Sequence, residues 1–253
     1  MGTHVHSLEI GEVKKAFFVG DVHLDPRAPD REQRFIKFLD YVRSEKPAVL
    51  FLMGDIFEFW YGYYHVMFTH HIKVISKLAC LRFEGIKIVY IVGNHDFLPG
   101  PVFSKYLNFI VALDPFIIKM GDKNVYLSHG DEVNTEDRGY IFLKKIIRNS
   151  LAQKFFKLVP ASWAWLLGRI TSDTSRKLKH FREEISPEVY RNFFDKCAAE
   201  NVDVIIHGHT HKAEERKIEF TEKTMQFINS GDWFGSGAYV IYENDDFKLK
   251  EFK

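Results

Sequence analysis

Short apolar runs that lead into polar residues recur along this chain. Residues 16–22, 49–55, 86–93, 125–130 and 202–208 each lead from apolar side chains into Asp, Asn or His. Continuous apolar runs of this length are typical of buried strands. They predict five strands whose ends carry polar side chains.

Helical patterns separate these runs. Between the first two, apolar residues recur at i, i+3, i+4 and i+7, which predicts an amphipathic helix that Pro47 helps to end. Residues 66–84 predict a second helix, and residues 238–252 predict a hairpin that turns at Asn244 to Asp246. Strands that alternate with helices indicate an α/β fold with some parallel pairing.

The pattern changes between residues 140 and 182. Ten Lys and Arg residues stand against the single Asp173 there, a net charge of +9. Apolar residues recur every four positions from Leu143 to Phe155, which predicts one basic amphipathic helix that ends before Pro160. An aromatic stretch with two Trp follows. This composition is typical of a lid over a long apolar ligand, of a membrane-surface contact, or of both. The alternative is a helical hairpin with a solvated basic face.

Composition narrows the class of protein. The 253 residues are 46% hydrophobic and 27% charged, as in a soluble globular protein, and we expect one domain over residues 1–253. The net charge of +1 argues against a general nucleic-acid-binding surface, and we expect a monomer. No apolar run reaches the roughly 20 residues of a membrane-spanning helix. Cys80 and Cys197 form no CxxC pair, and the N-terminus lacks the features of a signal peptide, which indicates a cytosolic chain.

The polar residues at the strand ends predict a composite site. In open α/β sheets, ligands bind at the carboxyl ends of strands. Two divalent ions that clamp a phosphate need a bridging carboxylate and a set of nitrogen and oxygen ligands. In an extended chain, side chains two residues apart point to the same side, so the side chains of Asp21 and His23 should point the same way. The candidate metal ligands are Asp21, His23, Asp55, Asn94, His129, His209 and His211.

The order of these motifs resembles a known family. DVH, GD, GNHD, HGD and GHTH, each after an apolar run, resemble the calcineurin-like metallophosphoesterase superfamily over residues 16 to about 242. The resemblance implies a sandwich of two β-sheets flanked by helices, with two divalent ions bridged by Asp55. The ion ligands that it implies are Asp21, His23, Asp55 and His211 for one ion, and Asp55, Asn94, His129 and His209 for the other. Mn²⁺ suits this mixed ligand set, and Fe, Zn or Mg stay open.

Three neighbouring residues receive supporting roles. We expect His207 to pack in the core or to support a ligand, because both ion sites are already supplied. We expect Asp96 and Asp131 to orient neighbouring imidazoles by hydrogen bonding, as carboxylates around metal sites commonly do.

A closer resemblance suggests the substrate. GDIFEFW (54–60), GNHDF (93–97), HGDEVNTEDRGY (129–140) and the basic aromatic insertion resemble the UDP-2,3-diacylglucosamine diphosphatases of lipid A synthesis. This implies a helical lid at 137–183 over two acyl chains, and a peripheral position on an anionic membrane, the cytoplasmic face of the inner membrane. It also implies attack of hydroxide on the α-phosphorus of the UDP moiety, which yields UMP and 2,3-diacylglucosamine 1-phosphate (lipid X). The candidate substrate contacts are Asn94, His95, Asp137, Tyr140, Ser175, Lys177 and Lys179.

Two positions depart from that family. Its best-known members have Arg after the motif's Asn, where this chain has His95, and SGDWFGSGAY (230–239) lacks the His that they carry beyond the Trp. His95 is a candidate phosphate-facing cation or general acid, and Asn94 and Asp55 complete the catalytic candidates. The departures keep open a metallophosphoesterase for another nucleotide-sugar, a cyclic nucleotide or a phospholipid head group. A scaffold that has lost its metals would show gaps among the ligand residues, and the sequence has none.

Overall fold

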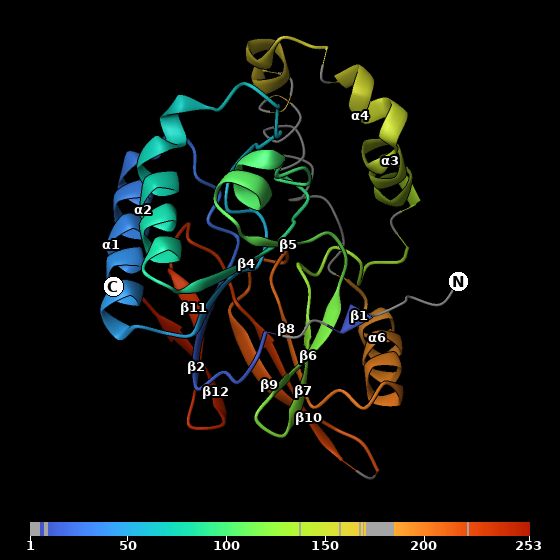
Figure 1. Cartoon of the computed structure of the whole chain (residues 1–253). Helices are drawn as coiled ribbons and strands as arrows, with labels where there is room; N and C mark the ends of the chain where they lie inside the picture. Colours follow the sequence, from blue (N-terminus) through green and yellow to red (C-terminus); the bar gives the residue numbers. More distant parts are fainter. Residues whose placement is uncertain are drawn as a thin grey trace.

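Two six-stranded sheets packed face to face form the body of the protein in a computed structural model of the chain (Figure 1). The structure describes residues 6–7, 10–136, 138–156, 158–166, 168, 170, 185–221 and 223–253. Helices cover the outer faces of both sheets. The predicted α/β sandwich is therefore confirmed.

The first sheet is mainly parallel. Strands β2 to β5 run parallel to one another, while β11 pairs antiparallel with both β2 and β12. In spatial order its strands are β12 (Asp246–Glu251), β11 (Ala238–Glu243), β2 (Lys15–Val19), β3 (Val49–Leu52), β4 (Lys87–Ile91) and β5 (Ile110–Ala112).

The second sheet is mixed. Strands β7, β8 and β10 run parallel, and β6 and β9 pair antiparallel with β7 and β10. In spatial order its strands are β1 (His6–Ser7), β6 (Phe116–Met120), β7 (Lys123–Leu127), β8 (Val204–His207), β10 (Thr224–Asn229) and β9 (Glu214–Glu219). The loops of the candidate site follow the carboxyl ends of parallel strands in both sheets.

Apolar packing joins these layers. Between the sheets, the rings of Phe18 and Phe51 stack with centroids 4.5 Å apart within one buried cluster. A second buried cluster lies on the outer face of the first sheet, where Phe35 of α1 and Leu78 of α2 pack. On the outer face of the second sheet, α6 buries Phe194. The described helices of the body are α1 (Pro29–Glu45), η1 (Thr69–His71), α2 (Ile72–Phe83), η2 (Val102–Tyr106) and α6 (Pro187–Ala199).

The predicted helices and hairpin are confirmed with shifted ends. The first helix ends where Lys46 takes the left-handed conformation, one residue before Pro47. The second begins only at Ile72, after the separate 3₁₀ turn η1 over Thr69–His71. The hairpin turns through Asn244 and Asp245, both with positive φ, as a two-residue turn of type I′ requires.

The five predicted strands exist but end earlier than expected. Strand β2 stops at Val19 and β3 stops at Leu52, so the polar residues of both runs lie in the loops that follow. This difference matters for the site, because a loop can turn several side chains toward one point.

The predicted single helix of the insertion is wrong in one respect. The structure has α3 (Arg138–Arg148) and α4 (Ser150–Phe156), with further helical residues at 161–166. The side-chain oxygen of Asn149 accepts hydrogen bonds from the N–H groups of Leu151 and Ala152, which caps a new helix at that point. In Figure 1, α3 and α4 lie at the top, beyond one end of the sheets.

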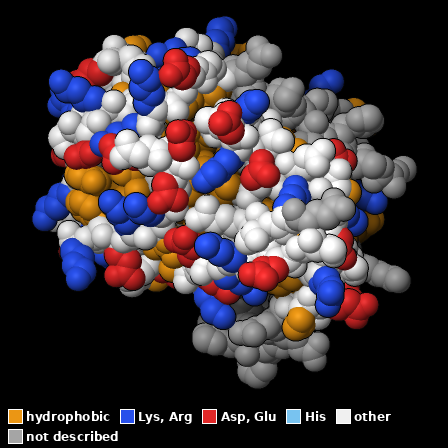
Figure 2. All heavy atoms as spheres, turned by 90° about the horizontal axis from the view of Figure 1, so that it is seen from below, with side chains coloured by type: hydrophobic (Ala, Val, Ile, Leu, Met, Phe, Trp, Pro, Cys, Tyr) orange, Lys and Arg blue, Asp and Glu red, His pale blue; other side chains and the backbone are white. Residues whose placement is uncertain are grey.

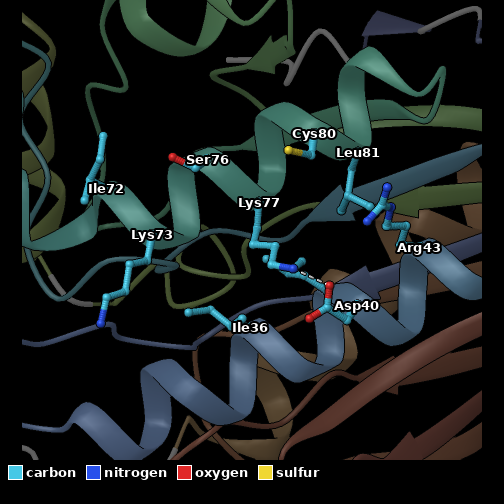
Figure 3. A pocket seen from close by; sticks show the side chains of 10 residues that line it. Ile36, Asp40, Arg43, Ile72, Lys73, Ser76, Lys77, Cys80 and Leu81 are labelled. Carbon is cyan, nitrogen blue, oxygen red and sulfur yellow. Dashed lines mark hydrogen bonds and ion pairs between the residues drawn. The ribbon is translucent and has the colours of Figure 1, made fainter.

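Other surfaces lie away from this end. Figure 2 shows the opposite face, where basic and acidic side chains are interspersed over the described residues. A groove of about 500 Å³ runs between α1 and α2, crossed by an ion pair of 2.5 Å between Lys77 Nζ and Asp40 Oδ1 (Figure 3). Among the described residues, no helix has the length and apolar character needed to cross a membrane.

Candidate metal centre

Loops that follow five strands meet at one end of the two sheets. The loops after β2 and β3 run side by side, because the N–H groups of Asp21 and His23 donate to the carbonyls of Gly54 and Asp55 at 3.0 and 2.9 Å. The loops after β4, β7 and β8 bring the remaining candidate ligands. All seven candidates lie together in two groups that share Asp55.

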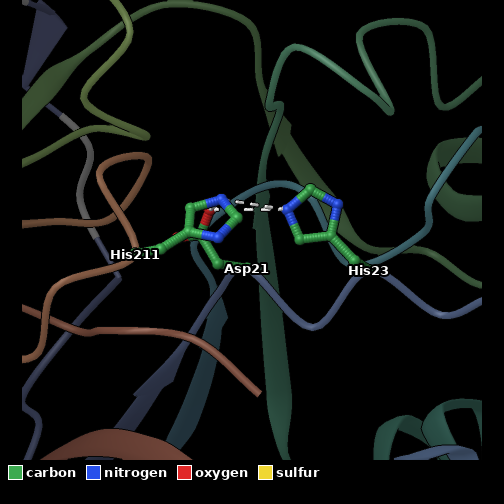
Figure 4. A group of neighbouring side chains, drawn as sticks. All are labelled: Asp21, His23 and His211. Carbon is green, nitrogen blue, oxygen red and sulfur yellow. Dashed lines mark hydrogen bonds and ion pairs between the residues drawn. The ribbon is translucent and has the colours of Figure 1, made fainter. Parts of the chain in front are cut away.

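Candidate site 1 consists of Asp21, His23, Asp55 and His211. His23 Nε2 lies 3.8 Å from Asp21 Oδ1, 3.6 Å from Asp55 Oδ2 and 3.3 Å from His211 Nε2. His211 Nε2 lies 3.4 Å from Asp21 Oδ1. Figure 4 shows Asp21 and His23, from the loop after β2, and His211, from the loop after β8, pointing toward one another.

Candidate site 2 consists of Asp55, Asn94, His129 and His209. His129 Nε2 lies 3.4 Å from Asp55 Oδ2 and 3.1 Å from Asn94 Oδ1. His209 Nδ1 lies 2.9 Å from Asn94 Oδ1 and 3.3 Å from His129 Nε2. Asp55 Oδ2 is therefore next to a histidine of each group.

The donor atoms fit divalent metal ions. Ligands that bind one ion at about 2.0–2.3 Å stand roughly 3–3.5 Å from one another, close to the separations in both groups. Asp21 Oδ1 is buried and accepts no hydrogen bond from the described residues. A buried carboxylate oxygen without a donor is costly, and a cation would satisfy it. Imidazole, carboxylate and amide donors together suit Mn, Fe or Zn.

Two glycines make room for the carboxylates. A Cβ on Gly93 would lie 2.1 Å from Asp55 Oδ1, and a Cβ on Gly208 would lie 2.0 Å from Asp21 Oδ2. Both distances are far below any real contact. These positions must stay glycine for the carboxylates to reach the centre.

The backbone of five of the seven candidate ligands is left-handed. Asp21, His23, Asp55, His209 and His211 all have φ between 49° and 68°. The expectation that an extended chain places Asp21 beside His23 is therefore wrong, although the two side chains do face together. This conformation costs a non-glycine residue roughly 1–2 kcal/mol. Such strain collects at functional sites, where the surrounding structure holds it in place.

Protonation in the site follows from burial and from the neighbouring charges. Burial acts against the ionised form of Asp21, but contacts with His23 and His211 outweigh it and lower the Asp21 pKa to about 2. Burial also opposes the charged form of His23, and Asp21 and Glu58 overcome it, raising the His23 pKa to about 9. A metal ion must therefore displace a proton from His23 when it binds.

Asp96 does not orient an imidazole, contrary to expectation. It is buried and accepts hydrogen bonds from the N–H groups of Asp55, Ile56 and Gly93 and from the Tyr90 hydroxyl. Because the three N–H groups lie on the loops after β3 and β4, Asp96 fixes the backbone that carries Asp55.

Asp131 and His207 lie next to the candidate ligands and contact residues around them. Asp131 forms an ion pair with Lys144 of α3, and the charges of His129 and His209 help to lower its pKa to about 2 against the effect of burial. His207 is buried and packs on Phe227, with ring centroids 4.9 Å apart. Its core position matches the sequence interpretation.

His95 lies at the edge of candidate site 1. Its Nε2 is 3.9 Å from Asp55 Oδ2, and its ring meets that of His23 edge-on at 4.7 Å. Its Nδ1 lies 2.9 Å from the carbonyl oxygen of Glu58, which can only accept, so Nδ1 carries a proton. Burial lowers the His95 pKa, which favours the neutral ring over the predicted cation. A general acid at this position must first take up a proton at Nε2.

The sequence interpretation overlooked two side chains that contact the site. Glu58 lies 3.3 Å from His23 Nδ1, and its only sequence signal is an acid within the aromatic run FEFW. Phe234 stacks on His211 with ring centroids 5.5 Å apart, beneath the guanidinium of Arg31 at 4.1 Å. Nothing in the local sequence distinguishes Phe234 from a core residue.

Most of the predicted substrate contacts in the insertion cannot be placed. Asp137, Ser175, Lys177 and Lys179 lie outside the described residues, and Tyr140 lies in α3 with its side chain outside the described part. These residues stay predictions.

Comparison with known proteins agrees with this geometry. Residues 14–213 match the family model for the calcineurin-like phosphoesterase. A Pseudomonas putida protein named UDP-2,3-diacylglucosamine hydrolase is 29% identical over 236 residues, which cover 93% of this chain and 98% of that protein. A protein of the same name from Blochmanniella pennsylvanica is 30% identical over 245 residues, covering 93% and 95%.

Similarity to solved structures is more distant. An archaeal phosphodiesterase superposes with a TM-score of 0.49 at 13% identity, covering 94% of this chain and 99% of its own. The family model, in contrast, spans well over half of the chain and includes all seven candidate ligands. The chain therefore belongs to the calcineurin-like phosphoesterase family.

Proposed function

We propose that the protein is a dinuclear-metal hydrolase that cleaves the diphosphate of UDP-2,3-diacylglucosamine. Water attacks the α-phosphorus, a new P–O bond forms, and the bond from this phosphorus to the bridging oxygen breaks. The products are UMP and 2,3-diacylglucosamine 1-phosphate, which leaves with the bridging oxygen and its electron pair. The observation that carries the proposal is the pair of four-residue groups that share Asp55, in a chain whose relatives bear the hydrolase name.

The seven candidate ligands would hold two divalent ions, and we favour Mn²⁺. When bound, such ions polarise a phosphoryl group and ease the deprotonation of water. Asn94 directs its Oδ1 at His129 and His209, so its amide nitrogen is the donor for a phosphate oxygen. His95, beside Asp55, faces the same region and is the candidate acid toward the leaving group.

The insertion would act as the lid over the acyl chains. An aromatic cluster joins it to the site loops: Phe59 and Tyr61 from the loop after β3 pack with Ala164 of the insertion. The hydroxyl groups of Tyr61 and Tyr63 donate to the carbonyls of Gln153 and Val159 at 2.9 Å. These contacts join the insertion to the loop that carries Asp55, which supports the proposed lid.

Exposed apolar side chains on the insertion support contact with lipid. A folded soluble protein rarely exposes so many large apolar residues on one short segment. With the basic residues of the same segment, they suit acyl chains and an anionic membrane, and we propose a peripheral position on the cytoplasmic face of the inner membrane. The exposed residues are Phe142, Ile146, Leu151, Phe155, Leu158, Trp163, Leu166 and Ile170.

One assay tests the reaction and its direction together. The purified protein is incubated with Mn²⁺ and UDP-2,3-diacylglucosamine in ¹⁸O-labelled water, beside the deacylated sugar and bis-p-nitrophenyl phosphate. Attack on the α-phosphorus places ¹⁸O in UMP, and the lid predicts faster turnover of the acylated sugar. Label in the sugar phosphate would contradict attack on the α-phosphorus. Equal turnover of the acylated and deacylated sugars would contradict the role of the insertion as a lid.

A second candidate function rests on His95. A neutral His95 gives the substrate no permanent cation, so a smaller phosphoester could be the natural substrate. Turnover of the generic diester alone in the same assay would favour this alternative.

A further inference from the structure

Glu58 lies between two histidines of the candidate metal centre. The residue is 5% exposed, with Oε2 3.3 Å from His23 Nδ1 and Oε1 3.9 Å from His95 Nδ1. We infer that Glu58 is a positioning residue that holds the His23 imidazole with Nε2 toward the metal and fixes His95 beside it. The inference rests on the proposed function, because it assumes that His23 is a metal ligand.

The two nitrogens of His23 require different protonation. Nε2 faces Asp21, Asp55 and His211, so a metal bound there needs the lone pair of Nε2. The single proton of the neutral ring must then sit on Nδ1, and Glu58 Oε2 is the acceptor on that side. The two atoms lie 3.3 Å apart, which is within reach of a hydrogen bond once Nδ1 carries the proton. Metal-binding histidines commonly donate their second N–H to a carboxylate in this way.

Glu58 fixes His95 by a separate contact. His95 Nδ1 donates to the main-chain carbonyl of Glu58 at 2.9 Å. This bond does not depend on the carboxylate, so a substitution of Glu58 leaves it in place. The carboxylate and the carbonyl of one residue therefore act on two rings that meet edge-on.

The backbone around Glu58 is itself held firmly. Its N–H donates to the Leu24 carbonyl at 3.0 Å, which ties it to the loop that carries His23. The residues on either side belong to different buried clusters: Phe57 packs in the cluster around α1 and α2, and Phe59 packs against the insertion. The carboxylate thus has a fixed position from which to orient the ring.

Metal titration of Glu58 variants tests the inference. We expect Glu58→Ala to weaken one of the two Mn²⁺-binding steps by about 10- to 100-fold in calorimetry of the chelator-treated protein. Glu58→Gln keeps an acceptor oxygen without the charge, so we expect a smaller loss, up to about 10-fold. Asp203→Asn is the control, because this carboxylate accepts a hydrogen bond from the Asn124 N–H at the ends of β7 and β8 that lie away from the site, and Mn²⁺ binding should not change.

A second readout separates positioning from a general structural role. In the Zn²⁺-loaded protein, ¹⁵N NMR of the imidazoles should show His23 protonated at Nδ1 in the wild type, with that signal lost or shifted in Glu58→Ala. Circular dichroism of the apo Glu58→Gln protein should match that of the wild type, which would show that the variant folds. Unchanged Mn²⁺ affinity and an unchanged His23 signal in both variants would overturn the inference, as would a wild type that binds no Mn²⁺.

These measurements use no substrate. If the wild type does not hydrolyse UDP-2,3-diacylglucosamine but Glu58→Ala still weakens Mn²⁺ binding, the proposed substrate is wrong and the role of Glu58 stands. If the substrate is hydrolysed and the Glu58 variants bind Mn²⁺ normally, only the role of Glu58 is refuted.

Discussion

Replacing Asp96 with Asn tests how the loop of Asp55 is held. Oδ1 of Asp96 accepts hydrogen bonds from the N–H groups of Asp55 and Gly93. Oδ2 accepts hydrogen bonds from the Ile56 N–H and the Tyr90 hydroxyl. The four donors use both oxygens fully, and the side chain is buried.

The magnitude follows from counting these donors. In Asp96→Asn, the amide NH₂ takes the place of Oδ2; the Tyr90 hydroxyl can turn and accept from it, but the Ile56 N–H loses its acceptor. One unsatisfied buried N–H costs about 2 kcal/mol, and two bonds to a neutral oxygen each lose about 1 kcal/mol. We therefore expect a loss of about 4 kcal/mol in the free energy of unfolding, close to 1000-fold in the folded-to-unfolded ratio.

Urea denaturation of the metal-free protein at pH 7.5 measures this loss. Asn244→Asp is the control, because Asn244 is an exposed turn residue with positive φ that Asp tolerates, and its change should stay within about 0.5 kcal/mol. A loss below about 1 kcal/mol in Asp96→Asn would refute the view that Asp96 fixes the loop.

Three further predictions concern stability and the insertion. Burial lowers the pKa of His71 well below its usual range, so only the unfolded chain takes up a proton there. The free energy of unfolding should therefore fall as pH drops below 6.5, by up to about 1.4 kcal/mol per pH unit. Urea unfolding at several pH values should show a smaller fall with pH for His71→Phe, and an equal fall would contradict this role of His71. Tyr61→Phe removes the bond to Gln153 and should cost about 1 kcal/mol while speeding hydrogen exchange in α4; unchanged exchange would contradict the anchor. Free Mn²⁺ at 100 times its dissociation constant should stabilise the chelator-treated protein by about 2.7 kcal/mol per ion, and no shift in melting temperature would argue against a metal centre in the native state.

The sequence predicts the fold well because burial leaves a direct mark on it. Continuous apolar runs locate β2, β3, β4, β7 and β8, since strands buried on both faces have few polar positions. The same runs lead into the candidate ligands, which the structure brings together. The strand ends were less accurate, because nothing in the run 16–22 marks the left-handed turn at Asp21, two residues after β2 ends at Val19.

Other features depend on contacts that no local pattern encodes. The four donors to Asp96 come from residues up to 41 positions away, so its sequence neighbours could not reveal its role. Glu58 meets His23 and His95 only through tertiary packing. Asn149, in contrast, is a helix-capping residue visible in the sequence, but the four-residue apolar spacing continues across it.

Anomalous diffraction from crystals grown with Mn²⁺ tests the dinuclear centre most directly. The account predicts two Mn²⁺ peaks, one bound by Asp21, His23, Asp55 and His211 and the other by Asp55, Asn94, His129 and His209, with Asp55 common to both. A single peak, or a second peak that Asp55 does not contact, would contradict it.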